Sequence, residues 1–302
     1  MPALPPQLAV LASLEEPRTV KHLAEANALP YQAVYRAVQE LHDRGILRSH
    51  REGKDLVVEA AAPAVPGLAR GLLLDHARQD WGRVFHGDRP VVLHVLDRIG
   101  DPTLAAQVCG KTPRTVYYTI RSLGPRGLLV KRKGRYAINP LLPPLKALLE
   151  ELAKAEGRKR LREVDARARP LWTLGPEVLF RSEGKLDGFG VHITALSAFA
   201  KYSVPLVIMH GSYYYLASRP LGVADAILQG LLVEPESRIN RSYCALVFEK
   251  RRPRNLMTKA RIYGLEEQAE ALIRYVDEHE PGDLFLPWRD HARYRRQYGV
   301  GA

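Results

Sequence analysis

The sequence predicts a mixed fold, in which two small, mainly helical blocks precede a larger α+β half. Two observations indicate this arrangement. The run from Val34 to Val58 returns at Val116 to Ile138, with no gap needed until after the second leucine of each copy. Beyond Pro170, short apolar runs alternate with amphipathic stretches, which is typical of strands and helices that share one domain.

Charge and composition narrow the function classes. The 302 residues carry 45 Lys and Arg against 33 Asp and Glu, a formal net charge of +12. Such an excess favours a polyanionic partner, and a basic surface with no binding role is the alternative. Cys109 and Cys244 lie far apart in unlike surroundings, so neither a disulfide framework nor a zinc site is expected.

Targeting signals are not expected either. The N-terminus lacks a basic segment followed by a long apolar run, which argues against a signal peptide. No stretch approaches about 18 continuous apolar residues, so no membrane span is expected. We therefore expect a reducing, cytoplasmic compartment.

Each copy of the repeat has the pattern of a helical block. Leu8 to Leu14 and Val20 to Ala26 precede the first copy, and Val91 to Ile99 and Leu104 to Cys109 precede the second. Within each copy, apolar residues then recur at spacings of three and four. This spacing predicts a longer third helix with one buried side.

Glycines mark the end of each longer helix and the turn that follows. Gly45 and Gly127 stand where the chain must leave the helix, because glycine accepts the left-handed conformation of a C-cap. A short apolar pair, a basic turn that contains Gly53 or Gly134, and a second apolar run predict a two-stranded hairpin. In the second copy, Thr112 followed by proline is a good helix start signal.

The order helix, helix, longer helix, hairpin resembles the winged helix-turn-helix family of DNA-binding modules. The resemblance covers residues 5–60 and 88–140, and it implies double-stranded DNA as the partner, with the third helix in the major groove. Winged helices that bind only protein are the alternative for each copy. The expected domains are winged helices at 1–60 and 88–140, a linker and helix at 61–87, a linker helix at 141–169 and an α+β domain at 170–302.

The outer side of each third helix and each hairpin turn are the expected DNA contacts, because Arg pairs with guanine, Gln with adenine and clustered cations with phosphate. We expect the second copy to bind more strongly, since its turn holds four cations in five residues whereas Glu52 and Asp55 dilute the first. The expected DNA-binding residues are Gln32, Arg36, Gln39, Arg51 and Lys54 in the first copy, and Arg114, Thr115, Tyr118, Arg121, Lys131, Arg132, Lys133 and Arg135 in the second.

A proline-rich joint at Pro140 precedes a long, charged helix. Its leucines form one apolar side, which either docks on the blocks or pairs with another chain. Arg158 to Arg162 form a further cationic run, most simply a solvated face of this helix.

The second half predicts strands at Pro205 to Met209 and Tyr243 to Phe248, and helices at Val191 to Tyr202, Val223 to Leu232 and Leu265 to Glu278. This order resembles the α+β domain of AbiEi-type antitoxin regulators, which join a winged helix to a domain of nucleotidyltransferase-like descent. The resemblance implies a transcriptional repressor associated with a toxin or defence locus.

Catalysis is not expected, and neither is a cofactor or a metal ion. A nucleotidyltransferase needs Gly-Ser followed by two carboxylates one residue apart, which hold the metal ions. Gly211-Ser212 is present, but the positions two away from Asp225 are Val223 and Ile227. The triplet Glu183 to Lys185 fits a nuclease motif, yet no preceding metal-binding Asp is evident.

The sequence thus predicts a DNA-binding transcriptional regulator with tandem winged helices, a C-terminal sensing or protein-association domain and no enzymatic activity. One alternative is an antitoxin-type regulator whose C-terminal domain holds a protein partner. Another is a DNA replication or processing factor that grips the duplex with little sequence preference. A homodimer, through Pro140 to Pro170 or through the C-terminal domain, is left open.

Overall fold

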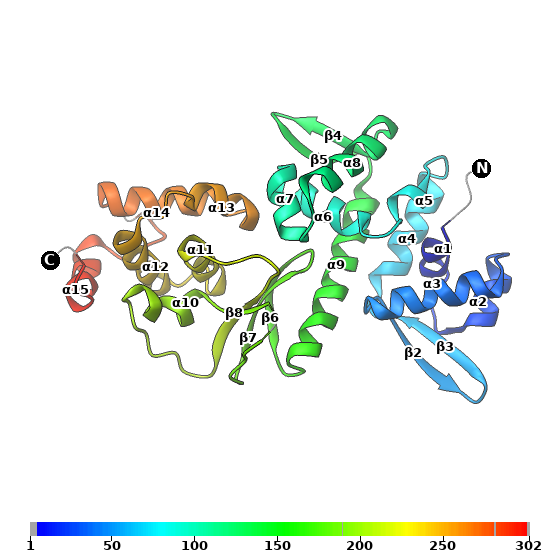
Figure 1. Cartoon of the computed structure of the whole chain (residues 1–302), viewed down its shortest axis with the longest axis horizontal. Helices are drawn as coiled ribbons and strands as arrows, with labels where there is room; N and C mark the ends of the chain where they lie inside the picture. The colour runs from blue at the N-terminus through cyan, green and yellow to red at the C-terminus, as the bar shows by residue number, and fades with distance from the viewer. Residues whose placement is uncertain (1–4, 189, 281, 301–302) are drawn as a thin grey trace. The chain divides into compact units, whose positions relative to one another are not determined.

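The computed structural model describes residues 5–188, 190–280 and 282–300 (Figure 1). Residues 1–4, where no signal peptide is expected, lie outside the described residues, as do the outer limits of the first and last expected domains. The chain is mixed α and β and divides into two compact units. Unit 1 is Met1–Glu163 with Leu174–Pro176, and unit 2 is Val164–Thr173 with Glu177–Ala302.

Block 1, which we define as residues 6–60 of unit 1, packs helices against a small antiparallel sheet of order β1-β3-β2. The apolar side of its third helix is buried, as predicted. Gly45 follows the end of this helix with a φ of 71°, the left-handed conformation that was predicted. The short β1 was not predicted. The elements are α1 (Pro6–Ala12), β1 (Arg18–Thr19), α2 (Val20–Ala26), α3 (Tyr31–Asp43), β2 (Leu47–Glu52) and β3 (Asp55–Ala60).

Block 2, residues 89–138, repeats the order of three helices and a hairpin, without a counterpart of β1. The Thr112 side chain caps the third helix by accepting a hydrogen bond from the backbone N–H of Thr115 at 3.3 Å. Lys133 and Gly134 have φ values of 48° and 81°, the left-handed pair that a tight hairpin turn needs. The elements are α6 (Arg89–Ile99), α7 (Pro102–Cys109), α8 (Pro113–Leu123), the 3-10 turn η1 (Gly124–Arg126), β4 (Leu129–Arg132) and β5 (Arg135–Ile138).

Helix α9 (Pro143–Val164) contacts both blocks, while α4 (Ala64–Asp75) and α5 (Trp81–Val84) connect them (Figure 1). Near its start, Lys146 Nζ lies 3.1 Å from Asp97 Oδ2 of block 2. Farther along α9, Glu156 Oε1 accepts a hydrogen bond from Arg44 Nε of block 1 at 2.5 Å. The predicted apolar side of α9 is buried, and its members are Leu145, Leu148, Leu149 and Leu152.

Unit 2 holds a four-stranded sheet of order β6-β7-β9-β8, in which β9 pairs antiparallel with β7 and β8. One short helix and a 3-10 turn lie between β8 and β9, and the other helices follow β9 along the chain. The strands are β6 (Arg169–Leu174), β7 (Glu177–Ser182), β8 (Val191–Ile193) and β9 (Ser212–Leu216). The helices are α10 (Ala195–Ala198), the 3-10 turn η2 (Phe199–Tyr202), α11 (Val223–Val233), α12 (Arg238–Arg251), α13 (Leu256–Tyr263), α14 (Glu266–Glu278) and α15 (Trp288–Gln297).

Several predictions for unit 2 are wrong. Tyr243 to Phe248 lies within α12 rather than in a strand, because a helix buried on most sides gives the same continuous apolar run. Pro205 to Met209 forms no strand, and Val207 is 97% exposed. Val191 to Tyr202 begins as β8 instead of a helix, since its first residues pair with β9. The strand expected in α12 was part of the order that resembles AbiEi-type regulators.

Among the described residues, no helix combines the length and the apolar character that crossing a membrane requires.

Gly45 allows block 1 to approach α9 closely. A Cβ atom added to Gly45 would lie 2.5 Å from the Cβ of Lys159, which is closer than real Cβ contacts come. The Lys159 ammonium also donates to the carbonyl of Asp43. The turn after α3 therefore fits α9 only with glycine at this position.

We expect Gly45→Ala to lower the free energy of unfolding by about 2–4 kcal/mol. The left-handed backbone conformation is unfavourable for alanine, and its Cβ would clash with Lys159. Gly53→Ala is the matched control, because Gly53 also has a positive φ (63°) but nothing lies within 4 Å of an added Cβ. Its expected loss is about 1 kcal/mol. Urea unfolding measures both, and equal losses would show that no close approach exists at Gly45.

His94 is a buried ionisable group of block 2. It lies on α6 with 8% of its surface exposed. Burial lowers the pKa of His94 from 6.5 to about 4, and the charge of Arg98 acts in the same direction. The folded chain therefore holds this imidazole neutral at pH values where the unfolded chain protonates it.

The stability contributed by neutral His94 is complete above pH 6.5 and is lost as the pH falls from 6.5 toward 4. A shift of this size corresponds to about 3 kcal/mol. We expect His94→Leu to flatten the pH dependence of the urea midpoint in that window. An unchanged pH slope in the variant would contradict this assignment.

Candidate functional site

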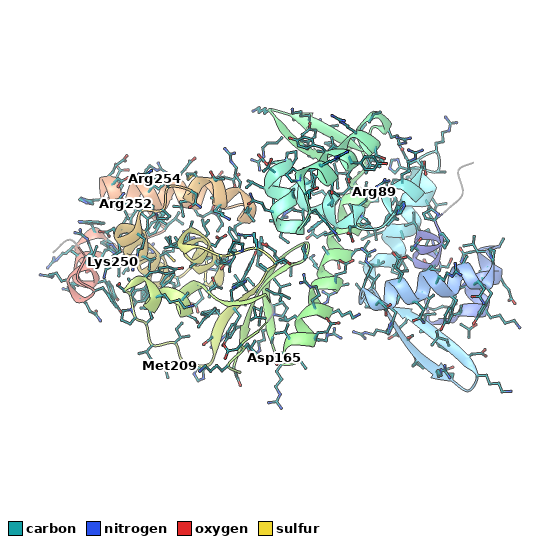
Figure 2. All side chains as sticks on the ribbon, viewed as in Figure 1. Arg89, Asp165, Met209, Lys250, Arg252 and Arg254 are labelled. Atoms are coloured by element: carbon teal, nitrogen blue, oxygen red, sulfur yellow. The ribbon has the colours of Figure 1, made fainter. Side chains whose placement is uncertain are left out.

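Helix α8 presents the predicted outer side to solvent. Tyr118 is 64% exposed, and the guanidinium of Arg89 lies 5.8 Å from the centre of its ring (Figure 2). The hydroxyl of Thr115 is within 3.0 Å of the Thr112 hydroxyl, so it takes part in capping the helix. The expected contacts on this helix are all exposed: Arg114, Thr115, Tyr118 and Arg121.

The hairpin β4–β5 places like charges side by side. Arg132 pairs directly with Arg135 across the two strands, next to the turn. Like charges at directly opposed positions destabilise an antiparallel pair. Lys131, Arg132 and Lys133 are exposed, and the Lys131 ammonium lies 5.1 Å from the centre of the Tyr136 ring.

Arg135 differs from the other cations of this hairpin. Its Nη2 donates to the carbonyl of Ile99 at 3.1 Å, and the neighbouring backbone N–H of Tyr136 donates to the carbonyl of Gly100 at 2.9 Å. These bonds attach β5 to the C-terminus of α6. Arg135 thus helps to orient the hairpin, a role that the sequence did not indicate.

A long stretch without acidic residues distinguishes the second part of block 2 and the chain that follows it. No Asp or Glu occurs from Pro102 to Leu149, and the stretch contains the cations Lys111, Arg114, Arg121, Arg126, Lys131, Arg132, Lys133, Arg135 and Lys146. The matching part of block 1, Tyr31 to Ala60, has five residues of each sign. Lys111 and Lys146 form ion pairs with acidic residues outside the stretch: Lys111 Nζ lies 2.5 Å from Asp88 Oδ2, and Lys146 Nζ lies 3.1 Å from Asp97 Oδ2.

Block 1 offers a weaker cationic surface at the equivalent positions. The pair next to its hairpin turn is Glu52 opposite Asp55, in place of two arginines. Tyr31 and Tyr35 stack on the outer side of α3 with their ring centres 6.2 Å apart. Of the expected contacts, Gln32, Arg36, Arg51 and Lys54 are exposed and Gln39 is half-buried.

Unit 2 contains a buried ionic cluster that the sequence analysis missed. The Arg219 side chain is 7% exposed and lies between Glu177 and Asp225, each 1% exposed. Arg219 Nε donates to Glu177 Oε1 and Nη1 donates to Asp225 Oδ1, both at 2.7 Å. The Tyr263 hydroxyl donates to the same Asp225 oxygen at 2.8 Å.

The charged groups of this cluster are paired with one another inside the fold. Burial raises the pKa of Glu177, while Arg219 acts in the opposite direction. Each carboxylate oxygen named above has a donor, so the cluster holds β7 to the loop before α11. No sequence pattern predicts this cluster, because its members come from separate elements with no common spacing. Within the described residues, no group of three or more His, Cys, Asp or Glu is placed to hold a metal ion.

Unit 2 has a basic run at the end of α12, Lys250 to Arg254, in which Lys250 and Arg252 bind groups within the fold (Figure 2). Lys250 Nζ donates to the carbonyls of Ser203 and Tyr298, at 2.9 and 2.5 Å. Arg252 pairs with Asp277. These cations therefore stabilise the α12 end of unit 2.

Comparison with known proteins bears on unit 2 alone. A family model described as "HVO_2833_C, C-terminal" matches residues 189–300, less than half of the chain. No curated protein and no solved structure matches the chain.

We expect Arg219→Met to lower the free energy of unfolding of unit 2 by about 3–5 kcal/mol, because two buried carboxylates lose their shared counter-charge. Arg252→Met is the matched control, since its side chain is 51% exposed and its partner Asp277 is 44% exposed. An exposed pair contributes about 0–1 kcal/mol. Urea unfolding would contradict the assignment if both variants lost the same amount.

Proposed function

We propose that the chain is a transcriptional regulator that binds double-stranded DNA through block 2, with block 1 in a supporting role. In this proposal both blocks are winged helix-turn-helix modules, unit 2 senses a signal or associates with a protein, and the chain catalyses no reaction. The observation that carries it is the exposed cationic surface formed by α8 and the β4–β5 turn, within a stretch that contains no Asp or Glu.

Helix α8 supplies the base contacts in this proposal. Arg114 lies in its first turn and Arg121 in its last, both exposed on the side opposite Val116 and Ile120. In helix-turn-helix proteins the third helix lies in the major groove, where an arginine pairs with O6 and N7 of guanine. Tyr118 lies between the two arginines and is available to a base or a phosphate.

The hairpin turn supplies contacts to the DNA backbone. Lys131, Arg132 and Lys133 neutralise phosphates and release condensed counterions, which adds affinity without sequence preference. Bound phosphate also screens the repulsion between Arg132 and Arg135 across the strands. The like-charge pair that costs stability in the unbound hairpin is thus compensated in the complex.

The two blocks have different surfaces, so the DNA site need not be palindromic. Single-module regulators dimerise to bind two symmetric half-sites about one helical turn apart. Here one chain carries both modules, and α9 contacts each of them. The proposed target is therefore an asymmetric site contacted chiefly by block 2.

We expect Arg132→Ala combined with Lys133→Ala to weaken binding to every duplex, since both side chains contact phosphate. The slope of log affinity against log salt should fall by about 2, because each lost contact removes about 0.9. Fluorescence anisotropy over a range of salt concentrations measures this slope for a duplex enriched by wild-type chain from a random pool.

Arg51→Ala combined with Lys54→Ala, on the β2–β3 hairpin of block 1, is the matched control and should change the slope less. A larger effect in block 1, or no effect in block 2, would contradict the assignment of block 2 as the main contact. If the random pool yields no enriched sequence although the duplex binds, the chain is a DNA-processing factor and not a sequence-specific regulator.

A further inference from the structure

A small pocket of unit 1 lies between the base of the β2–β3 hairpin and α9. Its volume is 310 Å³, at the lower end of the range of ligand sites. The cations Arg48, Arg158, Lys159 and Arg162 line it, together with His42 and Ser49, and none of the described residues that line it is acidic. We call this pocket the notch.

The notch changes the interpretation of the cationic run on α9. In the sequence, Arg158 to Arg162 are most simply a solvated helix face. Arg158 and Arg162 are one helical turn apart, so they share a side of α9. Arg48, the second residue of β2, lines the same pocket, so β2 and α9 bring cations from distant parts of the sequence together.

The geometry of the notch is held by neighbouring contacts. Lys159 donates to the carbonyl of Asp43, and Gly45 fits against the Cβ of Lys159. Arg44 pairs with Glu156 one turn earlier on α9. These contacts fix the distance between the third helix of block 1 and α9, so the cations of the notch do not depend on a mobile loop.

The charge of the notch is poorly compensated within the chain. Arg48 Nη1 lies 3.9 Å from Glu59 Oε1, with the two side chains 61% and 40% exposed, a contact that contributes little. Lys159 Nζ lies 3.7 Å from Glu163 Oε1. Within the described part of the chain, Arg158 and Arg162 have no ion pair or side-chain hydrogen bond. Gathering these four cations with so little counter-charge is unfavourable, and a bound anion would offset that cost.

We propose that the notch binds a phosphate group, which in the DNA complex is a phosphate of the duplex backbone. Guanidinium groups bind phosphate oxygens in a two-pronged manner, and the Ser49 hydroxyl adds a neutral donor. The duplex part of this inference rests on the proposed function. Block 1 then contacts DNA through phosphate at its hairpin base and α9, which positions the chain without adding base recognition.

The test compares Arg158→Ala combined with Arg162→Ala against Arg293→Ala combined with Arg296→Ala in the full-length chain. Both double variants remove two exposed or half-exposed arginines, and the second pair lies on α15 of unit 2. We expect the notch variant to lower the salt slope of duplex binding by about 2, whereas the α15 variant leaves it unchanged. Matching urea midpoints for all three chains confirm that the variants fold.

The outcomes separate this inference from the proposed function. If the Arg132 and Lys133 variant loses slope but the notch variant behaves like the α15 control, the notch does not contact DNA while block 2 does. If the wild-type chain binds no duplex, the proposed function fails.

Inorganic pyrophosphate then tests the notch by itself. A rise in the melting temperature of wild type that the notch variant lacks would identify a free phosphate compound as the ligand. The absence of that rise, together with an unchanged salt slope, would overturn the notch as a phosphate site.

Discussion

The contact between α9 and the turn after α3 is the constraint on which the arrangement of unit 1 depends. Gly45 removes the side chain that would separate the two backbones. Arg44 and Glu156 then join them through a largely buried pair, in which burial raises the pKa of the carboxyl group and Arg44 opposes that rise. Because the other end of α9 pairs with Asp97 of block 2, one helix fixes both blocks.

The two units handle charge in opposite ways. In unit 2, the buried carboxylates of Glu177 and Asp225 pair with Arg219, and Lys259 Nζ lies 3.7 Å from Asp225 Oδ2, so their charge is compensated inside the fold. In unit 1, Lys131, Arg132 and Lys133 lie in a stretch without Asp or Glu, and none of the described residues that line the notch is acidic. A protein tolerates such poorly compensated charge where binding an anion offsets the cost, and this contrast supports the proposal that unit 1 contacts nucleic acid.

The blocks were predictable from the sequence because their signals are local. Thr112 caps α8, and Gly45 follows the end of α3 with a positive φ, through residues adjacent in the chain. Gly127 does not end α8 as predicted, because α8 ends at Leu123 and Gly127 ends the 3-10 turn that follows. Unit 2 was harder, since the apolar run in α12 is buried on most sides and carries no helical period. Other contacts join residues far apart in sequence, and no residue spacing predicts them. Examples are the hydrogen bond from Arg135 to α6 and the position of Arg48 beside the α9 cations.

The single helix that spans both blocks has a mechanical consequence for the proposed complex. Once one block is bound, the other is held near the duplex at a high effective concentration, so the second contact forms without another search through solution. The separation of the two contacts is set by the protein, and the duplex must bend or twist to meet it. Base steps that deform easily would then be favoured at positions that no side chain touches.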